Sequence, residues 1–212
     1  MTAIMDFNHC YLLVDLQDVE SMVALKVVSG WAQRVAVPVS VQPFLKPKIN
    51  TAGDVPKGSD AFEAYKNKRA AARNLVRAQE RLRDLQRLGL TEVDRLSPLQ
   101  WLQIHWGLLQ VAEQSANLSM LFDKLFAVLR AADGRQRGDA LEILLAFLVS
   151  DSEPSVAFEM DKAHRDLRSV ASAWQAKGVL SAPSLWLNGE VFMGVGHLPL
   201  ITDRLLKLGL DK

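Results

Sequence analysis

The most informative stretch of the chain reads Ser184-Leu185-Trp186-Leu187-Asn188-Gly189-Glu190-Val191-Phe192-Met193. It consists of two short apolar runs separated by an Asn-Gly pair. Both residues of that pair tolerate positive φ angles, which a type I′ turn requires, so the stretch predicts a β-hairpin. Pro183 stands directly before the first predicted strand, and the apolar spacing of Leu198–Leu208 predicts a closing helix.

A second pair of strands is predicted near the N-terminus. Cys10–Gln17 is a short apolar run, which is typical of a buried central strand. Val35–Phe44 is rich in valine but holds two prolines, which is typical of an irregular or edge strand. Between them, Asp18 can cap a helix whose apolar residues recur at helical spacing. A strand, a helix and a strand in this order predict a right-handed βαβ unit.

The middle of the chain is predicted to be helical. Residues 45–58 have loop composition, and apolar spacing then predicts helices over 59–88, from Pro98, over Asn117–Ala132, over Gly138–Leu148 and from Ser152 to Lys177. The order of elements predicts an α/β chain with a four-stranded mixed sheet. Residues 1–58 and 178–212 form the sheet domain, and residues 59–177 form an all-helical insertion domain over one end of the sheet.

The predicted helix over 59–88 has two distinct faces. Arginines 69, 73, 77 and 81 follow one face, where they could meet an anionic substrate or an acidic partner, or simply form a solvated surface. The opposite face is apolar and carries residues at spacings of three and four, namely Ala71, Leu75, Ala78, Leu82 and Leu85.

Composition excludes several classes of function. The 212 residues carry a formal net charge of only +1, which argues against a dedicated nucleic-acid binder. The apolar runs are too short to cross a bilayer, and no targeting segment is recognised, so we expect a soluble, cytoplasmic protein without a membrane partner. Cys10 is the one cysteine, which excludes an internal disulfide, a CxxC pair and a multi-thiolate zinc site. The histidines show no metal-ligand spacing, and we expect no metal.

The stretch Gly178–Gly194 resembles the C-terminal signature of DsbA-like thioredoxin folds, in which a cis-proline precedes an Asn-Gly or Asp-Gly hairpin. It is most similar to the branch that contains 2-hydroxychromene-2-carboxylate isomerase and kappa-class glutathione transferase. Val14-Asp15-Leu16 with Asp18-Val19-Glu20-Ser21 resembles that branch's first strand and its Ser-Pro-Tyr-Ser helix start, and residues 51–56 resemble its Gly-Asn loop. The resemblance implies a thioredoxin-like fold with an all-helical insertion.

The resemblance also implies a chemistry. In this branch a serine at the helix start holds the sulfur of glutathione as a thiolate, because helix N-termini stabilise anions. The residue before the cis-proline, here Ala182 before Pro183, pairs with the peptide of glutathione. Asp54, Gly196 and His197 stand at other positions that contact glutathione in the branch. The implied activity is the isomerisation of a small aromatic acid by a cytoplasmic homodimer.

Departures from the branch change this expectation. Asp18 stands at the position of the reactive serine or cysteine, Asp54 at that of the loop asparagine, and Gly196-His197 at that of an Asp-Arg pair, whereas Ser21 keeps the second serine of the motif. Asp18 and Ser21 together occupy both cysteine positions of a redox CxxC pair. Dithiol–disulfide exchange is therefore excluded. A carboxylate would also repel a bound thiolate, since two unit charges ~4 Å apart cost about 4 kcal/mol at an effective dielectric of ~20.

Alternatives remain for each site residue and for the function. Asp18 is either a general acid or base or a helix cap, and Ser21 is either a ligand-contacting hydroxyl or a first-turn helix residue. His197 is either an acid–base group or a surface residue. The chain is accordingly either an isomerase or glutathione-transferase-like enzyme, or a catalytically silent relative that serves as a small-molecule or peptide binding module or as a homodimeric scaffold.

Overall fold

The computed structural model describes residues 9–35, 37–45, 60–90, 96–111, 118–149 and 158–207. The chain forms two compact units, one made of Met1–Lys46 with Glu92–Lys212 and the other of Pro47–Thr91. The domain boundaries expected from the sequence, at residues 58 and 178, stay a prediction. Asp54 and the loop around it lie outside the described residues.

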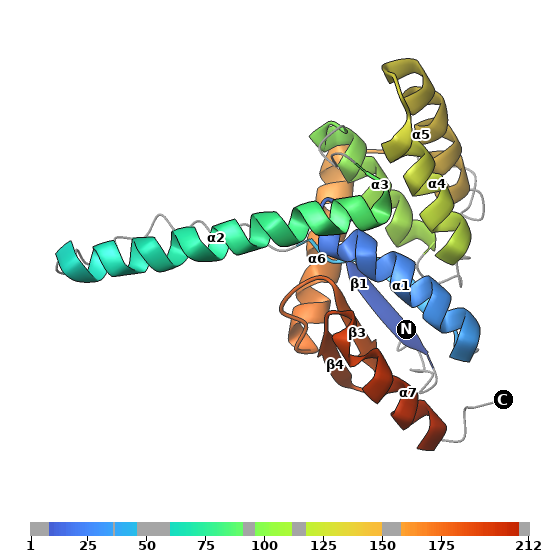
Figure 1. The fold of residues 1–212 in the computed structure, drawn as a ribbon. Helices are drawn as coiled ribbons and strands as arrows, with labels where there is room; N and C mark the ends of the chain where they lie inside the picture. The colour runs from blue at the N-terminus through green and yellow to red at the C-terminus, as the bar shows by residue number, and fades with distance from the viewer. Residues whose placement is uncertain are drawn as a thin grey trace. The chain divides into compact units, whose positions relative to one another are not determined.

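A four-stranded mixed sheet forms the centre of the larger unit, in the order β2-β1-β3-β4. β1 (Cys10–Val14) pairs in parallel with β2 (Val39–Pro43) and antiparallel with β3 (Ser184–Leu187), and β3 pairs antiparallel with β4 (Glu190–Met193) (Figure 1). Asn188 and Gly189 have φ angles of 51° and 85°, as a type I′ turn requires. The predicted hairpin and mixed sheet are confirmed.

Both N-terminal strands are shorter than the sequence indicates. β1 stops at Val14 because a tight turn follows, in which the amide of Asp18 donates to the carbonyl of Asp15 at 2.8 Å. β2 starts only at Val39, because α1 (Val19–Val35) continues through the first residue assigned to the strand. Apolar runs alone do not mark these ends, since a buried helix and a buried strand look alike over a few residues.

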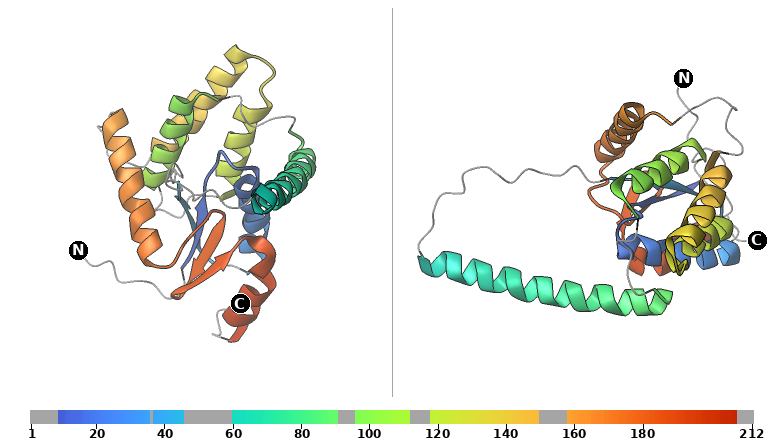
Figure 2. Two further views of the ribbon diagram at one scale, coloured as in Figure 1. Left: turned by 90° about the vertical axis from the view of Figure 1, so that its left-hand side faces the viewer. Right: turned by 90° about the horizontal axis from the view of Figure 1, so that it is seen from above.

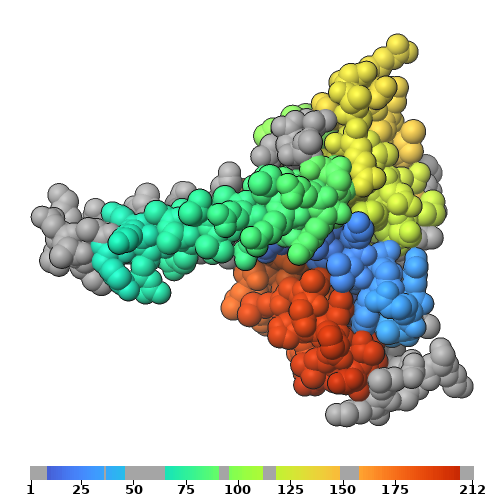
Figure 3. Space-filling model, in the orientation of Figure 1, coloured from blue at the N-terminus to red at the C-terminus, as the bar shows by residue number. Residues whose placement is uncertain are grey.

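Helices cover both faces of the sheet. Figure 2 shows α1 and α7 (Leu198–Lys207) on one face, and α3 (Pro98–Val111) and α6 (Met160–Ala176) on the other. The indole Nε1 of Trp31 donates to Thr202 Oγ1 at 2.9 Å and ties α1 to α7, which lie side by side in Figure 3. α3 and α6 both contact β2, so part of the predicted helical insertion packs directly on the sheet.

The remaining helices of this unit extend the layer. α4 (Leu118–Arg130) packs against α1 and α5 (Gly134–Val149), and α5 packs against α3. α5 begins four residues before the predicted start, because the carboxylate of Asp133 accepts a hydrogen bond from the amide of Gln136 at 2.8 Å and caps it. The last predicted helix of this block, from Ser152 to Lys177, corresponds to α6, and its first residues lie outside the described residues. α6 ends as predicted before Gly178, whose φ of 91° suits a glycine.

The sheet face under α6 is closed by aromatic side chains. Trp174 of α6 contacts Tyr11 and Trp186, with ring centroids 5.3 Å and 5.8 Å apart. Its indole Nε1 donates to Gln42 Oε1 at 2.7 Å, which satisfies the polar atom of a buried side chain. The cluster fixes α6 across the strands and thereby places Gly178 and the segment that leads into Pro183.

The smaller unit contains α2 (Asp60–Leu88), a helix of 29 residues that confirms the prediction for this segment. It ends at Gly89, whose φ of 67° suits a glycine and lets Leu90 donate to the carbonyl of Leu85 at 2.9 Å. Of the helices in the described ranges, none has the length and apolar character of a membrane span.

Candidate functional site

Three chain segments meet at one edge of the sheet. Leu13 pairs with Ser184, and Ser184 pairs with Met193, so β1 and β4 end where β3 begins. The edge therefore collects the loop into α1, the residues before β3 and the residues after β4. The amide of Gly194 donates to the carbonyl of Pro183 at 2.8 Å and joins the last two of these segments.

The segment before β3 has the backbone geometry that the resemblance implies. The Ala182–Pro183 peptide bond is cis. Ala182 is half-buried, and within the described ranges its backbone makes no hydrogen bond. An extended peptide could pair with such a backbone. The assignment of Ala182 and Pro183 to glutathione binding stays a prediction.

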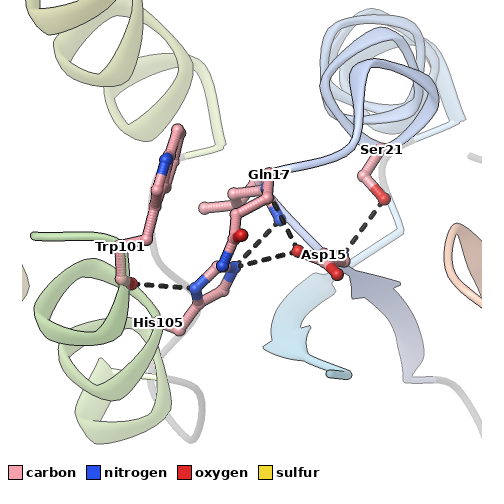
Figure 4. Close-up of polar contacts among 6 residues, drawn as sticks. Asp15, Gln17, Ser21, Trp101 and His105 are labelled. Atoms are coloured by element: carbon pink, nitrogen blue, oxygen red, sulfur yellow. Dashed lines mark hydrogen bonds and ion pairs between the residues drawn. The ribbon is translucent and has the colours of Figure 1, made fainter. Parts of the chain in front are cut away.

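Besides the Asp18–Asp15 backbone bond of the turn, three hydrogen bonds drawn in Figure 4 hold the loop between β1 and α1. The amide of Asp15 donates to Ser21 Oγ at 3.1 Å, and the amide of Gln17 donates to Asp15 Oδ1 at 3.1 Å. The amide of Leu16 donates to Nε2 of His105, a residue of α3, at 2.9 Å. Contacts from α1, from the loop itself and from α3 thus fix the position of Asp15.

Asp15 is the unusual carboxyl group of this edge. Its side chain is 30% exposed, and burial raises its pKa above the ordinary value of 3.8, although the hydrogen bond from Gln17 opposes the shift. Half-buried carboxyls with a raised pKa are typical of groups that accept and return protons. The sequence placed Asp15 only within the predicted first strand, Cys10–Gln17, and named it as part of that strand's resemblance to the branch. Its position at the carboxyl end of a central strand is a general signal for a ligand-binding residue.

His105 lies beneath this carboxyl and is fully buried. Its Nδ1 lies 2.8 Å from the carbonyl oxygen of Trp101, and a carbonyl only accepts, so Nδ1 carries the proton. Nε2 is then the unprotonated nitrogen that accepts the Leu16 amide and lies 3.6 Å from Asp15 Oδ1. Burial lowers the pKa of His105 from 6.5 to about 4, against the opposing hydrogen bond to Trp101, so the imidazole is neutral at pH 7.

The two residues that the sequence assigned to catalysis have structural contacts. Asp18 is exposed, its Oδ1 accepts the amide of Glu20 at 3.4 Å, and its carbonyl accepts the amide of Met22, which is the arrangement of a helix N-cap. Ser21 is fully buried, and its hydroxyl accepts the Asp15 amide. In this arrangement the Ser21 hydroxyl has no surface for ligand contact. Catalytic roles for Asp18 and Ser21 stay predictions.

The segment after β4 carries the remaining predicted positions. Gly196 and His197 are exposed in η1 (Val195–His197), a 3₁₀ turn that contacts α1. The ring of His197 lies near that of Phe192, with centroids 6.2 Å apart. Both residues therefore stand at the same sheet edge as Asp15, and their role in ligand binding stays a prediction.

The remaining features are the cysteine and the candidate metal ligands among the described residues. The Cys10 thiol is buried in β1, and burial raises its pKa to about 12, so it is not a thiolate nucleophile. In the described ranges no three side chains of His, Cys, Asp or Glu gather as metal ligands would. The start of α1, where the resemblance places a glutathione thiolate, instead holds the carboxylate of Asp18 as its cap. The residues present do not fit a thiolate at that position.

Comparison with known proteins gives a fold and no family. No protein-family model and no curated protein sequence matches the chain. A solved structure of selenomethionine-labelled 2-hydroxychromene-2-carboxylate isomerase matches with a TM-score of 0.55 and 14% sequence identity, over 95% of this chain and 96% of that one. At this identity the likeness shows the fold alone. The chain is an α/β protein with a DsbA-like arrangement, a thioredoxin-like fold that carries an all-helical insertion.

Proposed function

We propose that the protein is an isomerase for a small carbon acid, in which the Asp15 carboxylate accepts and returns the proton. One observation carries this proposal: a half-buried carboxyl with a raised pKa at the end of a central strand, fixed by Ser21, Gln17 and the His105 contact to Leu16. An acid whose pKa lies closer to neutrality serves both as base and as conjugate acid within one turnover.

The reaction consists of two proton transfers, so the substrate neither gains nor loses a proton overall. The ionised Asp15 takes a proton from a carbon next to a substrate carbonyl, and the electron pair of the broken C–H bond moves into the carbonyl to give an enolate. The protonated Asp15 then returns its proton to another carbon of the conjugated system. The backbone amide of Ala182, which makes no hydrogen bond within the described ranges, could donate to the enolate oxygen at the same edge.

The substrate class that we propose is a small aromatic acid. The likeness to 2-hydroxychromene-2-carboxylate isomerase favours this class, and the exposed His197 stands at the same sheet edge as Asp15, where its side chain could contact the substrate's carboxylate. Glutathione takes no part in the proposed reaction, because the carboxylate of Asp18 occupies the tip of α1 and opposes a thiolate there.

Exchange of substrate protons for deuterium in D2O, followed by proton NMR, tests the proposal. The substrates are a series of aromatic 2-oxo acids that carry a hydrogen on the saturated carbon next to the carbonyl, each with and without millimolar glutathione. We expect exchange without glutathione, and a loss of about 100-fold or more in Asp15→Asn. Asp139→Asn removes an exposed carboxylate of α5 and serves as the matched control that keeps the rate.

Asp18→Asn separates the two aspartates. Asparagine caps a helix as well as aspartate does, so this variant keeps the fold while it removes the charge. Exchange that survives in Asp15→Asn but is lost in Asp18→Asn would return the catalytic role to Asp18. Exchange that requires glutathione, or no exchange with any of the acids, would contradict the proposal.

A second candidate is a catalytically silent binding module. The half-buried Ala182 backbone without a hydrogen bond in the described ranges favours it, because a peptide strand could pair there. Amide chemical shifts of Ser181 and Ala182 in NMR titrations with glutathione and short peptides test it. Shifts that saturate, together with the absence of proton exchange, would favour the binding module over the isomerase.

A further inference from the structure

α2 carries an apolar seam whose four members are all exposed. Ala71, Leu75, Ala78 and Leu82 follow one another at spacings of four, three and four. This 3-4 spacing is the pattern of a coiled-coil seam, which is narrower than the apolar face of a helix that packs on a globular core. Leu75 is 62% exposed and Leu82 is 56% exposed, so two large apolar side chains of the seam face solvent.

The seam residues favour a partner helix that runs in the opposite direction. Each pair of seam residues that face each other across two helices forms one layer of the contact. In a parallel pair of α2 helices, each leucine would face a leucine and each alanine an alanine, so the alanine layers would be underpacked. In an antiparallel pair, Leu75 faces Ala78 of the second copy and Leu82 faces its Ala71. All four layers then combine one large and one small side chain. The seam is thus complementary to itself in this direction.

The charges of α2 allow two copies to approach. The helix holds eight Lys or Arg residues against four Asp or Glu residues, so two copies would repel each other if the charges met. The side chains that flank the seam are mostly neutral, with Ala72 and Gln79 on one side and Asn74 and Arg81 on the other. In the antiparallel pair Arg81 lies opposite Asn74 of the second copy, so no like charges face each other. Arginines 69, 73 and 77 lie on the outer side of the helix.

We propose that α2 docks antiparallel on α2 of a second copy through the seam Ala71–Leu75–Ala78–Leu82. The contact spans about 17 Å of helix, at ~1.5 Å per residue. A long helix that is rich in charge and largely solvent-exposed gains stability from such a partner, because isolated helices are marginal in water. This proposal does not depend on the proposed isomerase activity.

The mass of the full-length protein, measured by analytical ultracentrifugation over a range of concentrations, tests the docking. We expect a dimer of the 23.5 kDa chain. Leu75→Gln combined with Leu82→Gln should weaken the dimer by about 100-fold or more, because glutamine keeps the helix but loses the packing of every layer. Val76→Gln is the matched control: Val76 is 50% exposed on the same helix but lies off the seam, so its loss leaves the dimer intact.

Cysteine cross-linking tests the direction. The native Cys10 is buried and does not interfere. In a mixture of Ala71→Cys and Leu82→Cys chains, mild oxidation should give the mixed disulfide, whereas each variant alone should cross-link poorly. A monomer at all concentrations, a dimer that survives the double glutamine variant, or cross-linking of each variant with itself would overturn the proposal. Binding of the unaltered monomer to vesicles of anionic lipid, sensitive to the same glutamines, would assign the seam to a membrane surface instead.

Discussion

Replacement of His105 by glutamine should remove a large part of the protein's sensitivity to acid. The imidazole is fully buried and neutral, and its pKa falls from 6.5 in the unfolded chain to about 4 in the folded one. The folded state therefore favours the neutral form. The contribution of His105 to stability is fully present above pH 6.5 and is lost as the pH falls from 6.5 toward 4.

The magnitude follows from the shift. One pKa unit corresponds to ~1.4 kcal/mol, so a shift from 6.5 to about 4 corresponds to about 3 kcal/mol of unfolding free energy across this range. Asp15 acts in the opposite direction, because its pKa is raised: its contribution is present below 3.8 and is lost as the pH rises through the folded pKa. A variant that changes His105 but keeps Asp15 has the same Asp15 contribution as the unaltered chain. The difference between the two chains therefore gives the contribution of His105 to the pH dependence of stability.

Urea unfolding followed by tryptophan fluorescence at several pH values between 7 and 4 measures this contribution. Glutamine can accept the Leu16 amide and donate to Trp101 as His105 does, but it does not titrate. Between pH 7 and pH 4, we expect the unfolding free energy of His105→Gln to fall by about 3 kcal/mol less than that of the unaltered chain. His164→Gln, which removes an exposed histidine of α6, is the matched control. Equal acid sensitivity in His105→Gln and the unaltered chain would refute the reasoning.

Three further predictions concern the loop and the first strand. Ser21→Ala leaves the Asp15 amide without its acceptor and should cost about 1–3 kcal/mol in urea unfolding, whereas an unchanged midpoint would show that the contact is dispensable. Asp18→Ala should cost about 1 kcal/mol and Asp18→Asn almost nothing, and equal losses would argue against the cap. Cys10 should react with iodoacetamide at pH 8 only after unfolding, and rapid labelling of the folded chain would contradict its burial and raised pKa.

Local signals in the sequence account for much of the fold. The Asn188-Gly189 pair predicts the hairpin because only a few residues accept its backbone angles, and Asp18 predicts the start of α1 because few side chains cap a helix equally well. These features depend on neighbouring residues only. The cis bond before Pro183 came from the resemblance, since its isomer cannot be read from the local sequence.

The candidate site depends on contacts that the sequence does not display. His105 binds the amide of a residue 89 positions away, and neither helix periodicity nor motif spacing predicts that pair. The same holds for the raised pKa of Asp15. It arises from burial just after the end of β1, and the apolar run predicts that end too late, at Gln17 instead of Val14. Ser21, which the sequence assigned to catalysis by motif position, is fully buried and accepts the Asp15 amide, a contact that motif position does not predict.

A carbon-13 NMR titration of the Asp15 carboxyl in the full-length chain tests the central claim most directly. The signal is assigned by its absence in Asp15→Asn. The account predicts a midpoint above the ordinary value of 3.8, because burial disfavours the ionised form. A midpoint at or below 3.8 would contradict it and would leave Asp15 as an ordinary carboxylate with no advantage as a proton carrier.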